Sequence, residues 1–299
     1  CNTFKSLSSL DGASGEVLVS FPELPSITPR GRFDADLAAT HLRLRGKTHD
    51  YKILYSSITR LFLLPKPDGA HVFFVVGLEP PLRQGQTRYP YLVFQFSRDD
   101  EMELSLSISD AELQANWAGR LQKEYNAPTF EVVSCVFKGL ADKKLIAPGS
   151  FKATSGFPCI KCSVKANEGF LYPLEKSAMF IPKPTQLLNY ADVECVVFAR
   201  ISSGTSKTFD MKFEFRNGHE YSFSSIPKEE FGLLEEFFQS KGLKCKNELA
   251  EKGISSIGRG DAFGDDEDDE ESSPDEDYDD EEDEEEDEEG SEDEDEEDE

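Results

Sequence analysis

The stretch Tyr51–Pro67, YKILYSSITRLFLLPKP, consists of two apolar runs that are separated by a short polar step and followed by a Pro-Lys-Pro end. A weaker copy, LYPLEKSAMFIPKP, ends at Pro184, 117 positions after Pro67. Further pairs recur at nearly this offset: Phe94-Gln-Phe96 with Phe213-Glu-Phe215, Leu104-Ser-Leu106 with Tyr221-Ser-Phe223, and Ile108 with Ile226, at offsets of 117–119. A period of this length matches a whole small domain rather than a solenoid unit. The sequence therefore predicts two tandem copies of one domain.

The charge of the chain is concentrated towards its C-terminal end. The formal net charge is −28, and residues 261–299 hold 30 acidic residues and neither Lys nor Arg. The other 30 acidic residues face all 32 Lys and Arg, so residues 1–260 carry a net charge of +2. A segment with so few apolar side chains cannot bury enough surface to offset its ordering entropy. We expect a near-neutral folded body followed by a disordered acidic tail.

The N-terminal end and the cysteines indicate where such a chain can reside. No apolar run approaches the roughly 18 residues of a membrane-spanning helix, and residues 1–14 lack the zones of a signal peptide. The chain begins at Cys1 without Met, which predicts a fragment or a processed product. Six scattered cysteines suit a reducing compartment. Cys159 and Cys162 have the spacing of half a zinc site, but no second pair matches, so a plain strand is favoured over a metal site.

Short alternating or apolar runs predict antiparallel strands in both copies. In the first copy these runs are 16–21, 40–45, 50–55, 61–64, 72–78, 91–96 and 102–108, with 22–32 interpreted as a Pro-rich connection. In the second copy they are 159–164, 169–174, 178–181, 193–199, 209–215 and 220–223. Asn217-Gly218 between the last two predicts a type I′ hairpin turn.

Helical patterns follow the strands. Ser109 and Glu112 form a capping box, and an apolar stripe follows at spacing four: Leu113, Trp117, Leu121 and Tyr125. Residues 129–140 fit a helical period but are rich in β-branched residues, and a helix joining the two domains is favoured over a strand. A last helix is predicted after Pro227, with its stripe at Phe231, Leu234 and Phe238 and a C-terminal cap at Gly242.

Seven antiparallel strands closed by one helix make up the pleckstrin-homology fold, and Trp117 resembles the Trp usually found on its helix. The predicted fold class is therefore mainly β with capping helices: tandem pleckstrin-homology-like domains followed by a disordered acidic tail. The predicted divisions are a disordered or residual linker (1–15), a first domain (16–127), a second domain with the linking helix (128–246), a linker (247–260) and the tail (261–299).

No residue pattern predicts catalysis. His219-Glu220 opens like a zinc-protease motif, but Phe223 stands where that motif needs His. Neither a nucleophile elbow nor a phosphate-binding loop is present in the sequence. We therefore expect a non-enzyme that has no catalytic residue, no cofactor, no metal and no small-molecule substrate.

Three sets of charged residues are candidate binding surfaces. Arg43, Arg45 and Lys47 alternate along one strand and its turn, as in domains that hold phosphoinositide headgroups, although an ordinary exposed strand face is the favoured interpretation. A candidate DNA- or histone-binding surface comprises Lys138, Lys143, Lys144, Lys152, Lys161 and Lys165. The acidic tail favours a strongly basic partner. Ser272, Ser273 and Ser291 each precede an acidic residue by three positions, the pattern of acidophilic kinases.

Several segments closely resemble the middle domain of the structure-specific recognition protein and Pob family, the smaller subunit of the FACT histone chaperone. They are RGRFD (30–34), GKTHDYKILYSSITRLFLLPK (46–66), GQTRYPYLVFQFS (85–97), GRLQK (119–123), GFLYPLEK (169–176) and YSFSSI (221–226). The resemblance implies a subunit that binds core histones and nucleosomal DNA in the nucleus, on chromosomes. It also implies a partnership with the large Spt-type subunit through an N-terminal region that this chain does not contain.

The same resemblance implies a function and a histone-binding segment. Proteins of this family help to disassemble and reassemble nucleosomes during transcription, replication and repair, without ATP hydrolysis. They pair acidic stretches with an aromatic anchor, for which the candidates here are Phe263 with Asp265 and Asp266, and Tyr278 with Asp277, Asp279 and Asp280. The alternative is a phosphoinositide-binding membrane adaptor; the favoured hypothesis involves no membrane.

Overall fold

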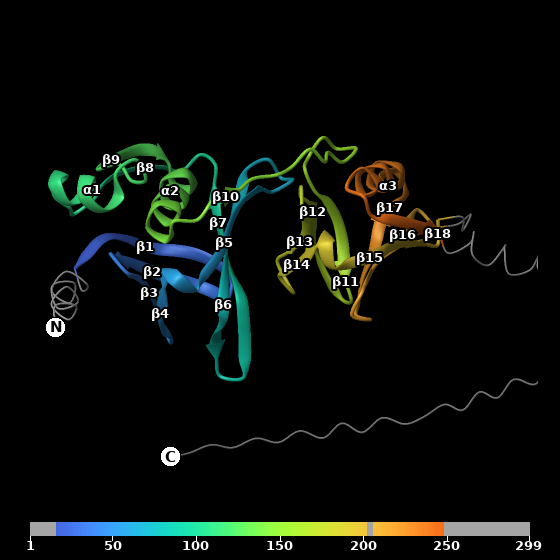
Figure 1. Ribbon diagram of the computed structural model, residues 1–299, viewed down its shortest axis with the longest axis horizontal. Coiled ribbons are helices and arrows are strands. Elements are labelled where there is room, and N and C mark those ends of the chain that lie inside the picture. The colour runs from blue at the N-terminus through green and yellow to red at the C-terminus, as the bar shows by residue number, and fades with distance from the viewer. Residues whose placement is uncertain (1–15, 202–205, 248–299) are drawn as a thin grey trace, which may run out of the picture. The chain divides into compact units, whose positions relative to one another are not determined.

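The structure, a computed structural model, describes residues 16–201 and 206–247 (Figure 1). The elements of the first half are β1 (Val17–Thr28), β2 (Arg30–Ala38), β3 (His41–Gly46), β4 (Asp50–Leu54), η1 (Tyr55–Ser57), β5 (Ile58–Pro65), β6 (His71–Gln84), β7 (Thr87–Ser97), β8 (Glu101–Ser105), α1 (Asp110–Trp117), β9 (Glu124–Pro128), α2 (Thr129–Ala141) and β10 (Leu145–Ile146). Those of the second half are β11 (Ile160–Val164), β12 (Asn167–Pro173), β13 (Ser177–Ile181), β14 (Gln186–Asn189), η2 (Tyr190–Asp192), β15 (Val193–Ala199), β16 (Thr208–Phe215), β17 (Glu220–Pro227), η3 (Lys228–Glu230), α3 (Phe231–Ser240) and β18 (Lys244–Asn247). No helix among the described residues is long and apolar enough to cross a membrane.

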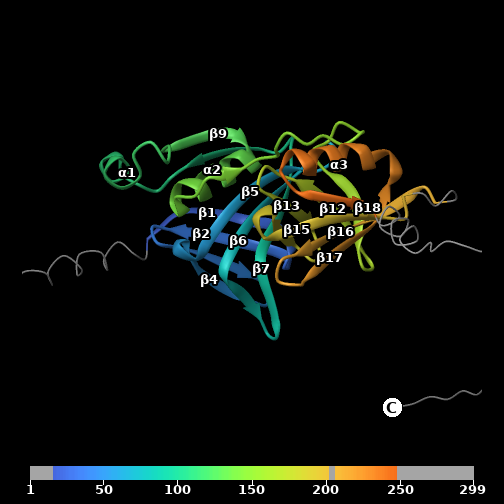
Figure 2. The same cartoon turned by 45° about the vertical axis from the view of Figure 1, so that its right-hand side comes forward.

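Each half is built on one curved sheet that a helix covers. The strand order is β10-β5-β6-β7-β1-β2-β3-β4 in the first sheet and β14-β13-β12-β11-β17-β16-β15-β18 in the second. Neighbouring strands are antiparallel except for the short parallel pairs β10–β5 and β18–β15. Helix α2 lies over the first sheet and α3 over the second (Figures 1 and 2). This confirms the predicted fold class of mainly β, tandem pleckstrin-homology-like domains with capping helices; the tail lies outside the described residues.

The two copies are aligned by a shared one-turn 3-10 helix, η1 at Tyr55 and η2 at Tyr190. The Tyr55 N–H donates to Thr40 O (3.3 Å) and the Tyr190 N–H to Lys176 O (3.1 Å), and both side chains are buried. These tyrosines lie 135 positions apart, whereas α2 and α3 begin 102 positions apart. The predicted repeat is confirmed, but its constant offset of 117–119 is wrong. That offset matched the end of β5 to the end of β13, whereas the shared 3-10 helix aligns β5 with β15. The offset falls from 135 to 102 because α1, β8 and β9 have no counterpart among the described elements of the second copy.

The Pro-rich segment 22–32, interpreted from the sequence as a connection, belongs to β1 and β2. These strands pair from Val17 opposite Ala38 to Ile27 opposite Arg30, with an irregularity between Phe21 and Leu24. Glu23 lies in this bulge with φ of 54°, and its N–H donates to Asp34 Oδ1 at 2.9 Å. A bulge leaves residues out of the hydrogen-bond ladder, so prolines beside it do not prevent pairing.

The helix predicted from the stripe at spacing four is shorter than expected. Its capping box is confirmed, with the Glu112 N–H 3.3 Å from Ser109 Oγ and the Ser109 N–H 3.3 Å from the Glu112 carboxylate. Helix α1 ends at Trp117, and Gly119 follows with φ of 72°. Tyr125 belongs to β9 instead, so the stripe combined residues of a helix, a loop and a strand that all contact the first core. Trp117 consequently does not lie on the helix that closes the first sheet.

That closing helix is α2, which confirms the helical interpretation of residues 129–140. Its buried residues belong to the first core, and the ring of Phe137 meets Phe74 edge-on at 5.3 Å. The β-branched residues do not prevent the helix, because Val132, Val133 and Val136 recur at helical spacing and all three are buried. The sequence assigned this helix to the second domain, whereas its packing joins it to the first; the other predicted boundaries remain predictions.

A third buried cluster joins the two halves, and we call it the interdomain core. It contains Phe62, Leu64, Phe73, Val75 and Val93 from the first half and Cys159, Tyr172, Leu174, Met179 and Ile181 from the second. Alternate residues of the same strands, such as Leu61 and Phe74, face the first core instead. Strands β5 and β6 are therefore buried on both faces, which explains their uninterrupted apolar runs. Residues 16–247 accordingly fall in one compact unit.

The hairpin between β16 and β17 differs from the expected type I′ turn. Gly218 has φ of 81°, but Asn217 does not have positive φ, which a type I′ turn requires at both central residues. The Gly218 N–H donates to Phe215 O and the Phe215 N–H to His219 O, both at 2.9 Å. This is a type I turn closed by a glycine bulge.

The C-terminal cap predicted for the last helix at Gly242 is confirmed, because Gly242 follows α3 with φ of 78°.

Candidate interaction surfaces

The candidate headgroup-binding residues Arg43, Arg45 and Lys47 lie on β3 and its turn. Two of these three cations form ion pairs with carboxylates of the protein. Arg45 contacts Asp36 at 2.8 Å, and Arg43 contacts Asp50 at 3.1 Å. Burial raises the pKa of Asp36, but hydrogen bonds from Ser20 and Arg45 outweigh it and keep the pKa below its ordinary value. Asp36 is thus ionised at neutral pH, and a phosphate would have to displace it from Arg45.

The six predicted lysines lie in three parts of the chain: the end of α2, the segment between β10 and β11, and β11 with its turn. Lys138 is exposed on α2, and the turn after α2 brings Lys143 and Lys144 close, with the Lys143 N–H donating to Lys138 O at 3.3 Å. Lys152 lies in the segment between β10 and β11. The remaining two are on β11 and its turn: Lys161 contacts Glu168 at 3.0 Å, and Lys165 has φ of 55°. The role of these lysines in DNA or histone binding remains a prediction.

The cysteine pair is part of the protein interior. Cys162 lies in β11 and Cys159 just before it, and both are buried. Burial raises the pKa of the Cys159 thiol to about 12, so it stays protonated at neutral pH. Among the described residues no group of His, Cys, Asp and Glu is arranged to hold a metal ion. The predicted strand is confirmed for Cys162, whereas Cys159 lies in the bend just before it.

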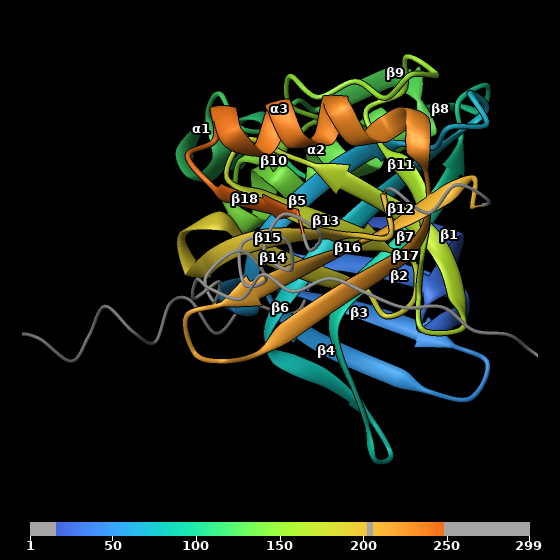
Figure 3. The same ribbon diagram turned by 90° about the vertical axis from the view of Figure 1, so that its right-hand side faces the viewer.

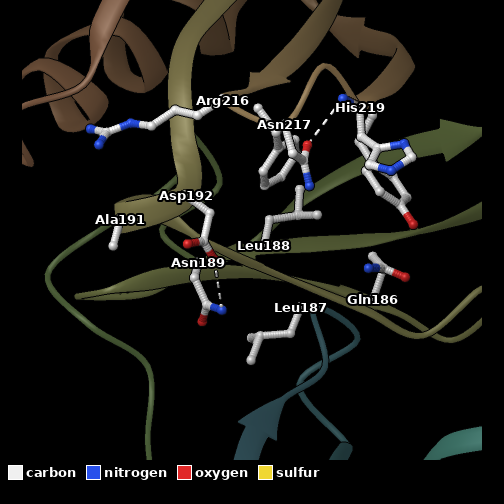
Figure 4. Close-up of a pocket in the computed structure, with 11 residues that line it drawn as sticks. Gln186, Leu187, Leu188, Asn189, Ala191, Asp192, Arg216, Asn217 and His219 are labelled. Carbon is white, nitrogen blue, oxygen red and sulfur yellow. Dashed lines mark hydrogen bonds between the residues drawn. The ribbon is translucent and has the colours of Figure 1, made fainter.

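An open groove of about 520 Å³ lies beside β14, the terminal strand of the second sheet (Figure 4). Its walls come from β14, η2 and the β16–β17 hairpin. Its polar groups bind one another: the His219 N–H donates to Asn217 Oδ1 (3.1 Å) and Asn189 Nδ2 to Asp192 Oδ2 (3.3 Å). Arg60 of the first half donates to Asn189 Oδ1 at 2.9 Å. The side chains of Asn189, Asp192 and Asn217 in this groove are therefore engaged in hydrogen bonds within the protein.

The candidate residues of the tail lie outside the part of the chain that the structure describes. They are the anchors Phe263 and Tyr278, the carboxylates Asp265, Asp266, Asp277, Asp279 and Asp280, and the serines Ser272, Ser273 and Ser291.

Comparisons with known proteins identify both halves of the described chain. Residues 16–145 match the family model of the SSRP1 PH domain, and residues 158–247 match that of the histone chaperone Rttp106-like middle domain. The first match extends through α2 to the start of β10, in agreement with the packing of α2 into the first core. The class of protein is therefore a tandem pleckstrin-homology protein of the histone-chaperone type.

Whole-chain relatives narrow this to one family. The chain is 49% identical over 252 residues to the FACT complex subunit pob3 of Schizosaccharomyces pombe, covering 84% of this chain and 49% of the relative. It is 44% identical over 250 residues to POB3 of Mycosarcoma maydis (83% and 45% covered), and 43% identical over 242 residues to SSRP1 of Xenopus laevis (81% and 35%). The chain belongs to the Pob3/SSRP1 family of FACT complex subunits, and it spans about half the length or less of these relatives.

One solved structure, of the Spt16D Pob3N heterodimer, is similar at 12% identity with a TM-score of 0.28, covering 68% of this chain and 86% of that one. A likeness this weak does not bear on fold or partners.

Proposed function

We propose that this chain is the histone-binding part of a FACT-type chaperone subunit, which acts on nucleosomes during transcription, replication and repair by binding and not by catalysis. The observation that carries the proposal is the presence in one chain of two chaperone-family domains and a segment of 39 residues with 30 acidic ones. Its partners are core histones and nucleosomal DNA in the nucleus, on chromosomes. The large Spt-type subunit binds through a region outside this chain.

The mechanism is competition between polyanions. Histones hold DNA mainly through neutralised phosphates, and that binding weakens steeply with salt. The acidic segment 261–299 offers carboxylates to the same basic surface, while the double domain provides a folded platform on which the interdomain core joins the two sheets. Masking the histone surface lowers the barrier to opening or rebuilding a nucleosome without ATP.

The membrane-adaptor alternative is less well supported. It rests on Arg43, Arg45 and Lys47, and the first two of these are paired with Asp50 and Asp36.

A histone pulldown tests the proposal. Purified core histones should bind the full chain, and binding should weaken strongly in a variant that lacks residues 261–299. The matched control is a variant in which the Asp and Glu of this segment become Asn and Gln, so that length is kept and charge removed. Equal histone binding by all three proteins, or sedimentation of the full chain with anionic vesicles but no histone binding, would contradict the proposal.

A further inference from the structure

The first sheet ends at β4, whose outer edge pairs with no other strand in the part of the chain that the structure describes. A groove of about 400 Å³ runs along this edge. One wall is β4 together with Ser57 of η1, and the other consists of residues 78 and 80–83 of β6. In Figures 2 and 3, β4 lies at the lower margin of the first sheet, and the β6–β7 hairpin extends beyond it. We call this feature the β4 groove.

Two hydrogen bonds fix the pattern of the β3–β4 ladder. The Gly46 N–H donates to His49 O at 2.9 Å at the turn, and the Tyr55 N–H donates to Thr40 O at 3.3 Å at the other end. In an antiparallel ladder, hydrogen-bonded pairs alternate with pairs that are not hydrogen-bonded. Six register steps separate the two bonded pairs, an even number, so both bonds predict the same alternation along β4.

Every second residue of β4 therefore directs its backbone towards the groove. Tyr51 and Ile53 occupy the bonded positions opposite β3, which leaves Asp50, Lys52 and Leu54 facing outwards. The outward N–H and C=O groups of Lys52 form no backbone hydrogen bond among the described residues. Unpaired groups of this kind on the edge of a sheet are a template for an added strand.

The opposite wall of the groove is apolar and cannot extend the ladder. Strand β5 pairs with β6 only as far as Ile58 opposite Leu78. Pro80 and Pro81 follow in β6, and proline has no N–H to donate. Together with Leu82 they line the groove. A strand added here would bond to β4 alone and pack its side chains against the prolines and leucines of β6.

The second copy has a groove at the corresponding place, but it is engaged within the protein. At the offset of 135 positions set by the two 3-10 helices, residues 51–54 and 57 correspond to 186–189 and 192, which line the groove beside β14. There Asn189 bonds to Asp192 and to Arg60 of the first half. The residue corresponding to Asn189 is Leu54, whose side chain is 52% exposed. The opening is thus a feature of both copies, and the one in the first half is free.

Charges on the β4 groove select among the strands that could be added. Asp50 is paired with Arg43 at 3.1 Å, whereas Lys52 and Arg83 line the groove and form no ion pair among the described residues. A lysine on an edge strand discourages pairing with another neutral or basic edge. Opposite charges on adjacent strands are instead favourable. The cations therefore favour an acidic strand.

We propose that the β4 groove binds an extended segment of a partner protein as an additional antiparallel strand, and that acidic and aliphatic residues alternate in this segment. Side chains of an added strand alternate between the two faces of the sheet. Those on the face of Lys52 lie beside cations, which favours Asp or Glu, and those on the face of Ile53 lie against the apolar wall, which favours Val or Ile. The five residues of β4 offer an edge of about 17 Å.

This partner is of a different kind from those proposed above. Strand addition requires a peptide backbone, which DNA does not have, and the DNA-binding surface of a histone is basic, so it would be repelled by Lys52 and Arg83. Main-chain hydrogen bonds supply affinity in this mode of recognition, and alternate side chains supply specificity. The β4 groove therefore defines a docking site for an acidic segment of a third protein.

Peptide binding by the full chain tests the proposal. Fluorescence anisotropy at low salt measures the affinity for a labelled peptide in which glutamate and valine alternate, Glu-Val-Glu-Val-Glu-Val-Glu. In the antiparallel arrangement the residues opposite Lys52 donate to β4, and these are the glutamates. N-methylation of the glutamate amides should lower affinity about tenfold or more, because it removes these donors while the charge is kept. The matched peptide with lysine in place of glutamate should not bind.

Two variants of one residue separate the backbone from the charge. Lys52→Ala and Lys52→Pro remove the same cation, but only proline removes the outward N–H, and neither removes a hydrogen bond to β3. We expect Lys52→Ala to lower affinity about threefold, as for an exposed ion pair, and Lys52→Pro to lower it about tenfold further. Edge strands tolerate proline where the N–H faces solvent, and unfolding curves should show both variants folded. Hydrogen exchange in residues 50–54 should slow when the peptide binds, with residues 186–189 unchanged.

Several results would overturn the proposal. These are equal affinity for the methylated and unmodified peptides, equal affinity for the lysine peptide, equal binding by the two Lys52 variants, or no binding by the wild type at low salt. Binding only after the Asp and Glu of residues 261–299 become Asn and Gln would identify the tail as the occupant. A dimer that Lys52→Pro abolishes would identify a second copy. Because Lys52→Pro leaves the acidic segment intact, its histone pulldown should match that of the wild type, so failure here is distinguishable from failure of the histone-binding proposal.

Discussion

The hydroxyl of Tyr172 donates a hydrogen bond to the carbonyl oxygen of Pro65, at 2.9 Å, across the boundary between the two sheets. Tyr172 is fully buried in the interdomain core, and burial raises its pKa well above the ordinary value. The hydroxyl therefore keeps its proton and remains a donor at neutral pH. Pro65 begins the Pro-Lys-Pro end of β5, so this bond satisfies a carbonyl where the strand leaves its ladder.

Removing this hydroxyl should destabilise the double domain. Tyr172→Phe leaves the half-buried Pro65 carbonyl without its donor, and we expect the free energy of unfolding to fall by about 1–3 kcal/mol. Chemical denaturation measures this change. The matched control is Tyr221→Phe, whose hydroxyl makes no hydrogen bond among the described residues, and which should stay within about 0.5 kcal/mol of the wild type. Equal effects would show that the bond contributes nothing.

Alanine substitutions at two helical glycines should change the stability of the protein in opposite directions. A Cβ at Gly139 in α2 would lie 2.7 Å from Arg120 O and closer still to the Leu121 side chain, whereas a Cβ at Gly232 in α3 would meet nothing within 4 Å. Gly232→Ala should stabilise the protein by up to about 1 kcal/mol, because alanine favours the helix. Gly139→Ala should destabilise it by about 1–3 kcal/mol through overpacking. Thermal unfolding distinguishes them; stabilisation by both would mean that α2 does not pack against residues 120–121.

Acid should weaken the ion pair between Glu175, which follows β12, and Lys241, which follows α3. Hydrogen bonds from Lys241 and the Ser150 N–H lower the pKa of Glu175 from 4.5 to about 2. A lowered carboxyl pKa gives stability that is present above pH 4.5 and is lost as the pH falls towards 2. Glu175 is half-exposed, so the contribution should be below about 1 kcal/mol.

The measurement is the free energy of unfolding of wild type and Glu175→Gln between pH 2 and 7. The difference should be present at neutral pH and vanish near pH 2. Glu168→Gln, in the exposed pair with Lys161, serves as the control for loss of a surface charge. A difference that is independent of pH would contradict the assignment.

The tail should recognise histones through more than charge. An aromatic ring buried in a small apolar pocket of the partner typically contributes about 2 kcal/mol or more, and this part survives salt. We therefore expect Phe263→Ala with Tyr278→Ala to weaken binding of the histone dimer at ~0.15 M salt, although the net charge is unchanged. The single variants show which ring is the anchor. If all four proteins bind equally, the tail acts as a plain polyanion.

Local features of this protein were predictable from the sequence because neighbouring residues encode them. Alternation of apolar and polar residues predicted strands, and the Ser109–Glu112 spacing predicted a capping box that the structure confirms. The charge division at residue 261 is likewise a property of the sequence alone. Similar local patterns in the two copies revealed the repeat, but not its alignment, because an insertion changes the offset between Tyr55–Tyr190 and α2–α3.

Tertiary structure decided which faces are covered and which charges are accessible. The sequence of α2 predicts a helix with an apolar stripe, but only packing shows that the stripe joins the first core. The run in β5 is apolar throughout because its two faces enter two different cores, and one of these is made by residues about 110 positions away. In the same way Arg45 and Arg83 look alike in the sequence, yet one lies 2.8 Å from Asp36 and the other opposite Arg88. Such pairings depend on contacts between residues far apart in the chain, and local periodicity carries no record of them.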